Sequence, residues 1–262
     1  MSAHLRLMRR FLIQALVRET HYRAHFVATL TVGLAELLVG LLPVWFLYGH
    51  ADEVNGWTGA EVVALVGAYQ ITTGMLATFV APNLTRMTAY ITKGELDLVL
   101  VRPVSAQFYL TFRWIRPAEL GKSATGLVTL CSGLAAAGAR PGPIEVVQAI
   151  VVGCCGLVLL TCAWSALVYL AFWTQGAGPI TAVFDAFMEA GRYPLAYYPA
   201  AARAFLTFAF PVGFATSFPI EALTDGVGWL PVLGGVAMCV AAVAALHLYW
   251  RLGVRGYSSA SS

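Results

Sequence analysis

The apolar residues of this chain run in long blocks, and the polar residues gather between them. An apolar block of about 17–25 residues can cross a bilayer as a helix. The chain has six such blocks, at about 26–48, 61–80, 118–138, 146–173, 203–220 and 229–250. We therefore predict an all-α integral membrane protein with six transmembrane helices, and one membrane domain over residues 1–262.

Composition agrees with this pattern. Hydrophobic residues make up 59% of the chain and charged residues 11%, whereas a soluble domain carries roughly 25% charge. So few charges cannot cover a water-exposed surface. We expect the chain to lie in a lipid bilayer and to bind no nucleic acid.

Residues 1–23 carry five arginines around apolar residues spaced three and four apart. This pattern predicts an amphipathic helix on the membrane surface. The alternative is a signal peptide. However, Arg18 and Glu19 interrupt the apolar run, and no Ala-x-Ala-like cleavage site follows.

The positive charges predict the orientation of the spans. Of the 16 lysines and arginines, we place only Arg140 in a loop on the side opposite the N-terminus. Basic residues favour the cytoplasmic side, so both termini are expected in the cytoplasm. The less apolar stretch 174–202 predicts a second interfacial helix there, at about Ile180–Ala190.

The fifth span has two interpretations. Pro211 and Pro219 interrupt the block at 203–220, so residues 205–228 form either a full span or a re-entrant hairpin. In the second case the true fifth span begins near Ile180. Re-entrant backbone is tolerated where protein covers it or where it lines a cavity.

Two predicted spans carry a polar residue near the middle, with glycines on the same helical face. They are Gly33, Glu36 and Gly40 in the first span, and Gly67, Gln70 and Gly74 in the second. Glycines allow close helix approach, so we expect the two spans to pack through these faces. A charged Glu36 would cost roughly 2.5–3.5 kcal/mol at mid-bilayer, which suggests either a substrate path or helix packing.

Motifs for catalysis or metal binding are weak. Gly121-Lys122-Ser123 resembles the end of a phosphate-binding loop, but Arg116 stands where that loop needs glycine. We expect Lys122 at the cytoplasmic end of the third span, with its ammonium group in water. The sequence therefore predicts no catalytic residues and no metal site.

Within the long polar region 81–117, the segment Ile91–Ser105 is amphipathic and charged. It predicts a short helix on the membrane face that contacts a soluble partner; a solvated loop is the alternative. Glu95, Asp97 and Arg102 are the expected polar contacts, and Leu96, Leu98 and Leu100 the buried side. The full candidate set is Lys93, Gly94, Glu95, Leu96, Asp97, Leu98, Leu100, Arg102 and Pro103.

The run from Gly94 to Val104 resembles the segment after the second membrane helix of ABC-2-type permeases, in particular a bacterial six-span subgroup. The resemblance continues in later short motifs, namely Arg192-Tyr193-Pro194-Leu195, Leu206-Thr207-Phe208 with Pro211, Phe218-Pro219 and Arg255-Gly256-Tyr257. It implies the type V-like fold of ABC-2 exporters, in the cytoplasmic membrane of a bacterium.

The resemblance also implies a function. Such a chain is the permease subunit of an ATP-binding cassette exporter and is not itself an enzyme. A separate cytoplasmic ATPase, expected as a dimer, binds ATP and Mg²⁺ and docks on residues 81–117. A second permease subunit, identical or homologous, completes the pathway, and this chain binds no cofactor.

An ion- or proton-coupled secondary transporter is the alternative. It would need several charged residues within the membrane and usually an internal repeat. Only Glu36 qualifies clearly by sequence, and no repeat is evident.

Overall fold

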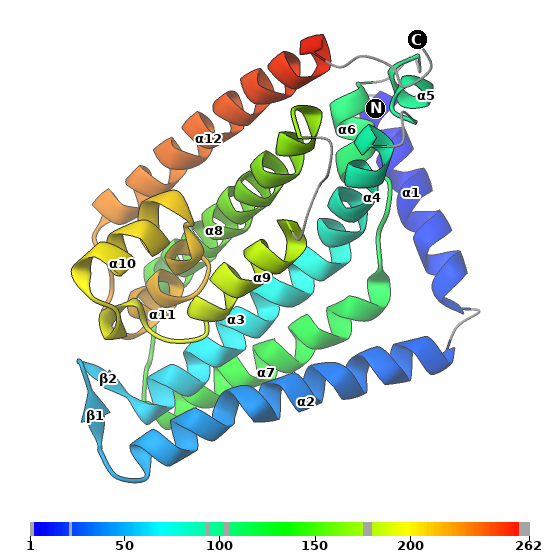
Figure 1. Cartoon of the computed structure of the whole chain (residues 1–262). Helices are drawn as coiled ribbons and strands as arrows, with labels where there is room; N and C mark the ends of the chain where they lie inside the picture. The colour runs from blue at the N-terminus through cyan, green and yellow to red at the C-terminus, as the bar shows by residue number, and fades with distance from the viewer. Residues whose placement is uncertain (1–2, 21–22, 93–94, 102–104, 175–179, 257–262) are drawn as a thin grey trace.

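The computed structural model describes residues 3–20, 23–92, 95–101, 105–174 and 180–256. Its long helices lie alongside one another, and α1 with α4–α6 gathers at one end (Figure 1). The helices are α1 Ala3–Thr20, α2 Arg23–Tyr48, α3 Gly59–Phe79, α4 Ala81–Thr92, α5 Asp97–Leu100, α6 Ala106–Phe112, α7 Leu120–Ala136, α8 Pro143–Tyr169, α9 Ile180–Ala190, α10 Ala200–Ala204, α11 Ser217–Thr224 and α12 Trp229–Gly256. One hairpin joins β1 Glu53–Val54 to β2 Trp57–Thr58.

Four helices are long and apolar enough to cross a membrane. They are Val27–Tyr48, Gly59–Phe79, Pro143–Phe172 and Trp229–Gly256. Their apolar side chains remain largely exposed on α2 and α12, as expected of helices that face lipid. The prediction of an all-α membrane protein is confirmed. The predicted third span corresponds to α7, which has 17 residues.

The turn before α3 explains where that helix begins. Asn55 and Gly56 both have positive φ, 49° and 83°, which is the geometry of a tight two-residue hairpin turn. Thr58 then caps α3: its hydroxyl accepts from the Glu61 amide, and the Glu61 carboxylate accepts from the Thr58 amide. The hairpin and the cap thus fix the residue at which α3 begins.

Helices α3 and α7 form the closest pair. A side chain at Gly67 would overlap the backbone at Leu130, and one at Gly133 would overlap the backbone at Ala64. Gly74 likewise lies against Ser123. The prediction that Gly67 and Gly74 pack against the first span is therefore wrong. They face α7, because its own glycines at the matching heights let the two backbones approach.

The polar region 81–117 is largely helical. Helix α4 continues α3 after a break at Val80, and its buried Met87 and Ile91 join a hydrophobic core. Phe11 of α1 packs edge-to-face on Tyr109 of α6, with ring centroids 5.9 Å apart. The short helices at this end therefore form one packed unit attached to α3.

Helix α9 covers the predicted range Ile180–Ala190 and packs one face against α8. Phe184 and Met188 are buried, and Phe184 stacks on Trp164 of α8 with ring centroids 4.2 Å apart. Further along, the Tyr197 hydroxyl is hydrogen-bonded to that of Tyr48, at the far end of α2. Residues 180–198 therefore reach from α8 to the β-hairpin end, with one face of α9 buried and most of its other residues exposed.

The segment predicted as the fifth span, 203–220, is not one straight helix. Helix α10 leads into a π-helix at Phe205–Ala209, and the chain bends by 75° before α11. Pro211 lines a cavity together with Cys162 of α8, and Pro219 lies beside Gly153 of the same helix. A bend of this size is the geometry of a broken span or of a re-entrant loop.

Candidate functional site

The main polar cavity lies among α2, α3, α7, α8 and α9 and has a volume of about 500 Å³. Its size falls within the range of small-molecule sites, about 300–1,000 Å³. Five charged residues line it together with apolar and aromatic ones. The lining is Glu36, Tyr69, Thr73, Leu76, Ala77, Ala81, Lys122, Trp164, Phe184, Asp185, Met188, Glu189 and Arg192.

Glu36 forms an ion pair with Lys122 of α7 in this cavity. The carboxylate side chain is 45% exposed, whereas the lysine side chain is 16% exposed. Lys122 lies in the first turn of α7, near the end of its span, but its ammonium group is paired with Glu36 and largely buried, whereas the sequence suggested that it lies in water. The ion pair with Lys122 also explains how a charged glutamate is tolerated within the apolar helix α2.

A second pair joins Arg192 to Glu189, with Nη2 and Oε1 3.1 Å apart. The guanidinium carbon also lies 5.2 Å from the ring centroid of Tyr69, whose hydroxyl donates to Glu189 Oε1 at 3.4 Å. Gly40 lies against Val66 of α3 and the Arg192 side chain, at distances of ordinary van der Waals contact. This part of the first span therefore packs on α3 beside the cavity.

Gln70 links three helices beside the cavity. Its Nε2 donates to the Gly33 carbonyl of α2 at 2.8 Å and to Thr125 Oγ1 of α7 at 3.2 Å. The side chain is 3% exposed. The prediction that Gln70 connects the first two spans is confirmed, and the same side chain also holds α7. Gly33 serves this contact and lies against the Lys122 side chain.

The coupling segment is described only in part. Lys93, Gly94, Arg102 and Pro103 lie outside the described residues, as does the side chain of Leu100. Leu96 is fully buried and Val99 is 4% exposed.

The expectation that Leu98 belongs to the buried side is wrong, since it is 68% exposed. Among the described side chains of this segment, Leu96 and Val99 are the ones that pack into the core with α4 and α6. Glu95 is exposed and Asp97 is half-buried. An acidic residue and an apolar one therefore face outward side by side.

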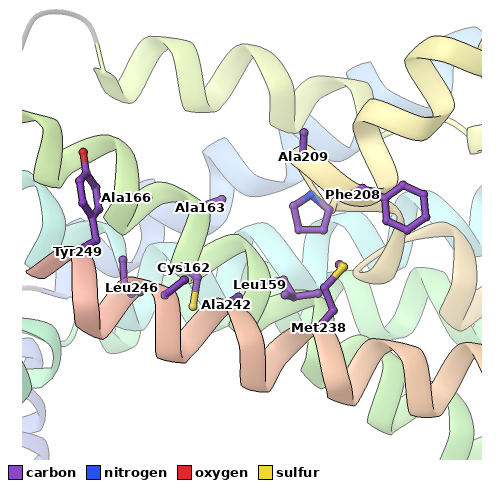
Figure 2. Close-up of a pocket in the computed structure, with 12 residues that line it drawn as sticks. Leu159, Cys162, Ala163, Ala166, Phe208, Ala209, Met238, Ala242, Leu246 and Tyr249 are labelled. Atoms are coloured by element: carbon purple, nitrogen blue, oxygen red, sulfur yellow. The ribbon is translucent and has the colours of Figure 1, made fainter.

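A second cavity, of about 320 Å³, is almost entirely apolar. Figure 2 shows its lining side chains, which come from α8, α12 and the bent segment that contains Phe208, Ala209 and Pro211. Cys162, Ala163 and Ala166 lie on one wall, Met238 and Leu246 on the other. The two cavities lie on different sides of α8 and differ in chemistry.

Sequence reasoning missed Lys122, Asp185, Glu189 and Arg192 as cavity residues. The available signal was the loss of apolar character at 174–202, which we attributed to a surface helix. Amphipathicity has the same pattern whether the polar face meets water or a polar cavity. Among the described residues, no group of three or more His, Cys, Asp or Glu could hold a metal ion.

Comparison with known families gives one clear result. The ABC-2 family transporter proteins match residues 34–261, which is most of the chain. No curated protein and no solved structure matches it. The matched region contains the whole polar cavity, the segment Ile91–Ser105 and the bent segment before α11. The chain therefore belongs to the ABC-2 family of transporter proteins and is a permease component of an ABC transporter.

Proposed function

We propose that this chain is the membrane-spanning subunit of an exporter that moves its substrate out of the cytoplasm with ATP hydrolysed by a separate subunit. The family match over residues 34–261 is the observation that carries the proposal. ATP and Mg²⁺ would bind in the partner ATPase, and this chain would supply no catalytic residue.

The proposed topology has six crossings with both termini in the cytoplasm of a bacterium. Four of the crossings are the long helices α2, α3, α8 and α12. Helix α7 would make the third crossing in chain order, since its 17 residues extend about 25 Å at 1.5 Å per residue, close to the hydrocarbon thickness of a bilayer. The stretch 180–198, which contains α9, would make the fifth. Arg140 and Arg203 are the basic residues assigned to the outer side, so the charge bias still favours this orientation.

The ATPase would dock on the end formed by α1, α4, α5 and α6. Leu98 and Val101 are 68% and 82% exposed there, beside the acidic Glu95. Because Leu96 and Val99 anchor α5 in the core that includes α4, a push on α5 would move α4 and hence α3. This is how ATP binding in the partner would alter the cavity.

Glu36 and its cavity would form the substrate path. Its other interpretation was helix packing, and the ion pair with Lys122 joins α2 to α7 in that sense. Both roles are compatible, because a pair that lines a path also sets the spacing of its walls. A second permease subunit, identical or homologous, would provide the facing half of the route.

The test is gentle purification of the tagged chain from its host, followed by mass spectrometry of the bound proteins. The expected result is a stoichiometric ATPase, with or without a second permease. The double variant Glu95→Lys with Asp97→Lys should release it, whereas Glu53→Lys, at the opposite end, should not. Retention of the ATPase by the double variant would contradict the proposed docking surface.

One observation favours an ion- or proton-coupled transporter as a second candidate. The polar cavity holds five charged residues, where the sequence had indicated one. Recovery of the chain alone, even after crosslinking in the membrane, together with transport that a proton gradient drives without ATP, would support that function instead.

A further inference from the structure

The cations and the carboxylates of the polar cavity differ in how far their side chains are exposed. The two cations are largely buried, with Lys122 at 16% and Arg192 at 15% exposure, and each is paired with a carboxylate. Their partners are open: Glu36 is 45% exposed and Glu189 is 58% exposed. A molecule that enters this cavity therefore meets carboxylate oxygens before it meets the cations.

Asp185 adds an uncompensated charge. It is exposed in the cavity lining, and it forms no ion pair with any residue of the described chain. The five charged groups, three carboxylates and two cations, sum to −1. One positive charge on a ligand would neutralise the cavity, and in a low-dielectric setting such a charge is attracted strongly.

Two buried polar groups in the walls also lack partners within the described residues. The Trp164 indole N–H is one; its side chain is 4% exposed and lines the cavity. The Gln70 carbonyl oxygen is the other, and it borders a narrow extension shared with Glu36, Lys122 and Arg192. Gln70 Nε2 donates to a carbonyl, which fixes the orientation of this amide. Buried polar groups are normally hydrogen-bonded, so these two atoms are exceptions in the walls around the cavity.

The rest of the lining is apolar and aromatic. Leu76, Met188 and the stacked rings of Trp164 and Phe184 lie in the cavity wall and make it apolar, with little of each side chain exposed. Aromatic faces also attract cations, and most strongly where water is excluded. The cavity thus combines exposed carboxylates with an apolar and aromatic wall.

From this arrangement we propose that the cavity binds a monocationic amphiphile, an organic cation with an apolar or aromatic body. The proposal rests on the proposed function in that it names the substrate class of the same cavity. Asp185 is the principal counter-ion, Glu36 and Glu189 supply further negative potential, and the aromatic wall holds the body. An anionic molecule of equal size would meet the carboxylates and be rejected.

The test uses two probes of the same shape and opposite charge, tetraphenylphosphonium and tetraphenylborate. Binding of each is measured to the purified full chain without ATP, with protein-free micelles subtracted. The expected result is saturable binding of tetraphenylphosphonium, weakened at least tenfold in Asp185→Asn and largely retained in Asp185→Glu. Asp52→Asn, which alters an acidic residue in the loop before the β-hairpin, should leave it unchanged. Each variant is first checked for an unaltered elution volume and melting temperature.

Equal saturable binding of both probes, or undiminished tetraphenylphosphonium binding in Asp185→Asn, would overturn the proposal. So would the absence of saturable binding in the unaltered chain. Because the assay needs no ATPase, its outcome is separate from the co-purification experiment. Cation binding by a chain that recruits no ATPase would retain the cavity's ligand class and reject the ABC mechanism.

Discussion

The two sides of α3 are built in opposite ways. Toward α7, Gly67 and Gly74 leave no room for any side chain, and the two backbones touch. Toward α9, Tyr69 and Thr73 project into a cavity that contains two ion pairs. One helix therefore belongs both to a closely packed pair and to the wall of an open space.

Small residues and long charged residues have different effects on helix packing in a membrane. Since lipid and helix surfaces are equally apolar, close packing of small residues is what holds helices together there. Long charged side chains have the opposite effect, because they keep the helices apart and fill the interval with groups that must be paired. We expect the α3–α7 seam to move as a rigid unit and the cavity to change shape.

The largest effect is expected from filling the seam. Gly67→Leu places a side chain where the Leu130 backbone lies. We expect a loss of roughly 3 kcal/mol in the free energy of unfolding, the upper end of the range for overpacked sites. The variant should show a strongly lowered melting temperature in detergent and little folded protein on size exclusion. A melting temperature equal to that of the unaltered chain would show that the seam is not closely packed.

Breaking an ion pair of the cavity should cost less. In Lys122→Leu the Glu36 carboxylate loses its partner, and because it is 45% exposed we expect about 1–2 kcal/mol, below the roughly 3–5 kcal/mol of a fully buried pair. Thermal unfolding measures the change. The double variant with Glu36→Gln should recover part of the loss, since no unpaired charge remains; a further loss of the same size would contradict coupling between the two.

A smaller effect is expected at the β-hairpin end. The hydroxyls of Tyr48 and Tyr197 are hydrogen-bonded, so Tyr197→Phe should lower the free energy of unfolding by about 1 kcal/mol. Tyr193→Phe is the control, because that hydroxyl has no hydrogen bond among the described residues. Equal destabilisation by both would mean that the bond to α2 does not fix the fifth crossing.

The smallest effect, of opposite sign, is expected outside both regions. Gly234 of α12 has open space around the position of a side chain. Gly234→Ala should leave stability unchanged or raise it by up to about 1 kcal/mol, since glycine disfavours a helix interior. A destabilised variant in a melting experiment would reveal a packing partner on α12.

The helices α2, α3, α8 and α12 could be predicted from the sequence because each is a long unbroken apolar block. The path of residues 180–224 could not. Helix α9 is amphipathic because it borders a polar cavity, and composition alone does not distinguish that from the membrane surface. Pro211 and Pro219 did indicate a break, and the re-entrant alternative followed from them.

The sequence predicted one residue of the polar cavity, Glu36, but not the charged residues around it. A glutamate in an apolar block stands out, so Glu36 was identified. Its partner Lys122 is distant in sequence and sits near the start of its span, where a solvated lysine is the ordinary interpretation. The glycine faces were recognised correctly as packing surfaces, but spacing along one helix does not reveal which neighbour it meets.

The most direct test of the contrast between seam and cavity is a pair of distance measurements by spin labelling in the assembled transporter. One pair, Leu38 and Val183, reports on α2 and α9 across the cavity; the other, Val63 and Val128, reports on α3 and α7. Native cysteines are first replaced, and distances are compared without nucleotide and with ATP trapped before hydrolysis. We expect the first distance to change by several ångströms while the second stays constant. A constant first distance, or an equal change in both, would contradict this expectation.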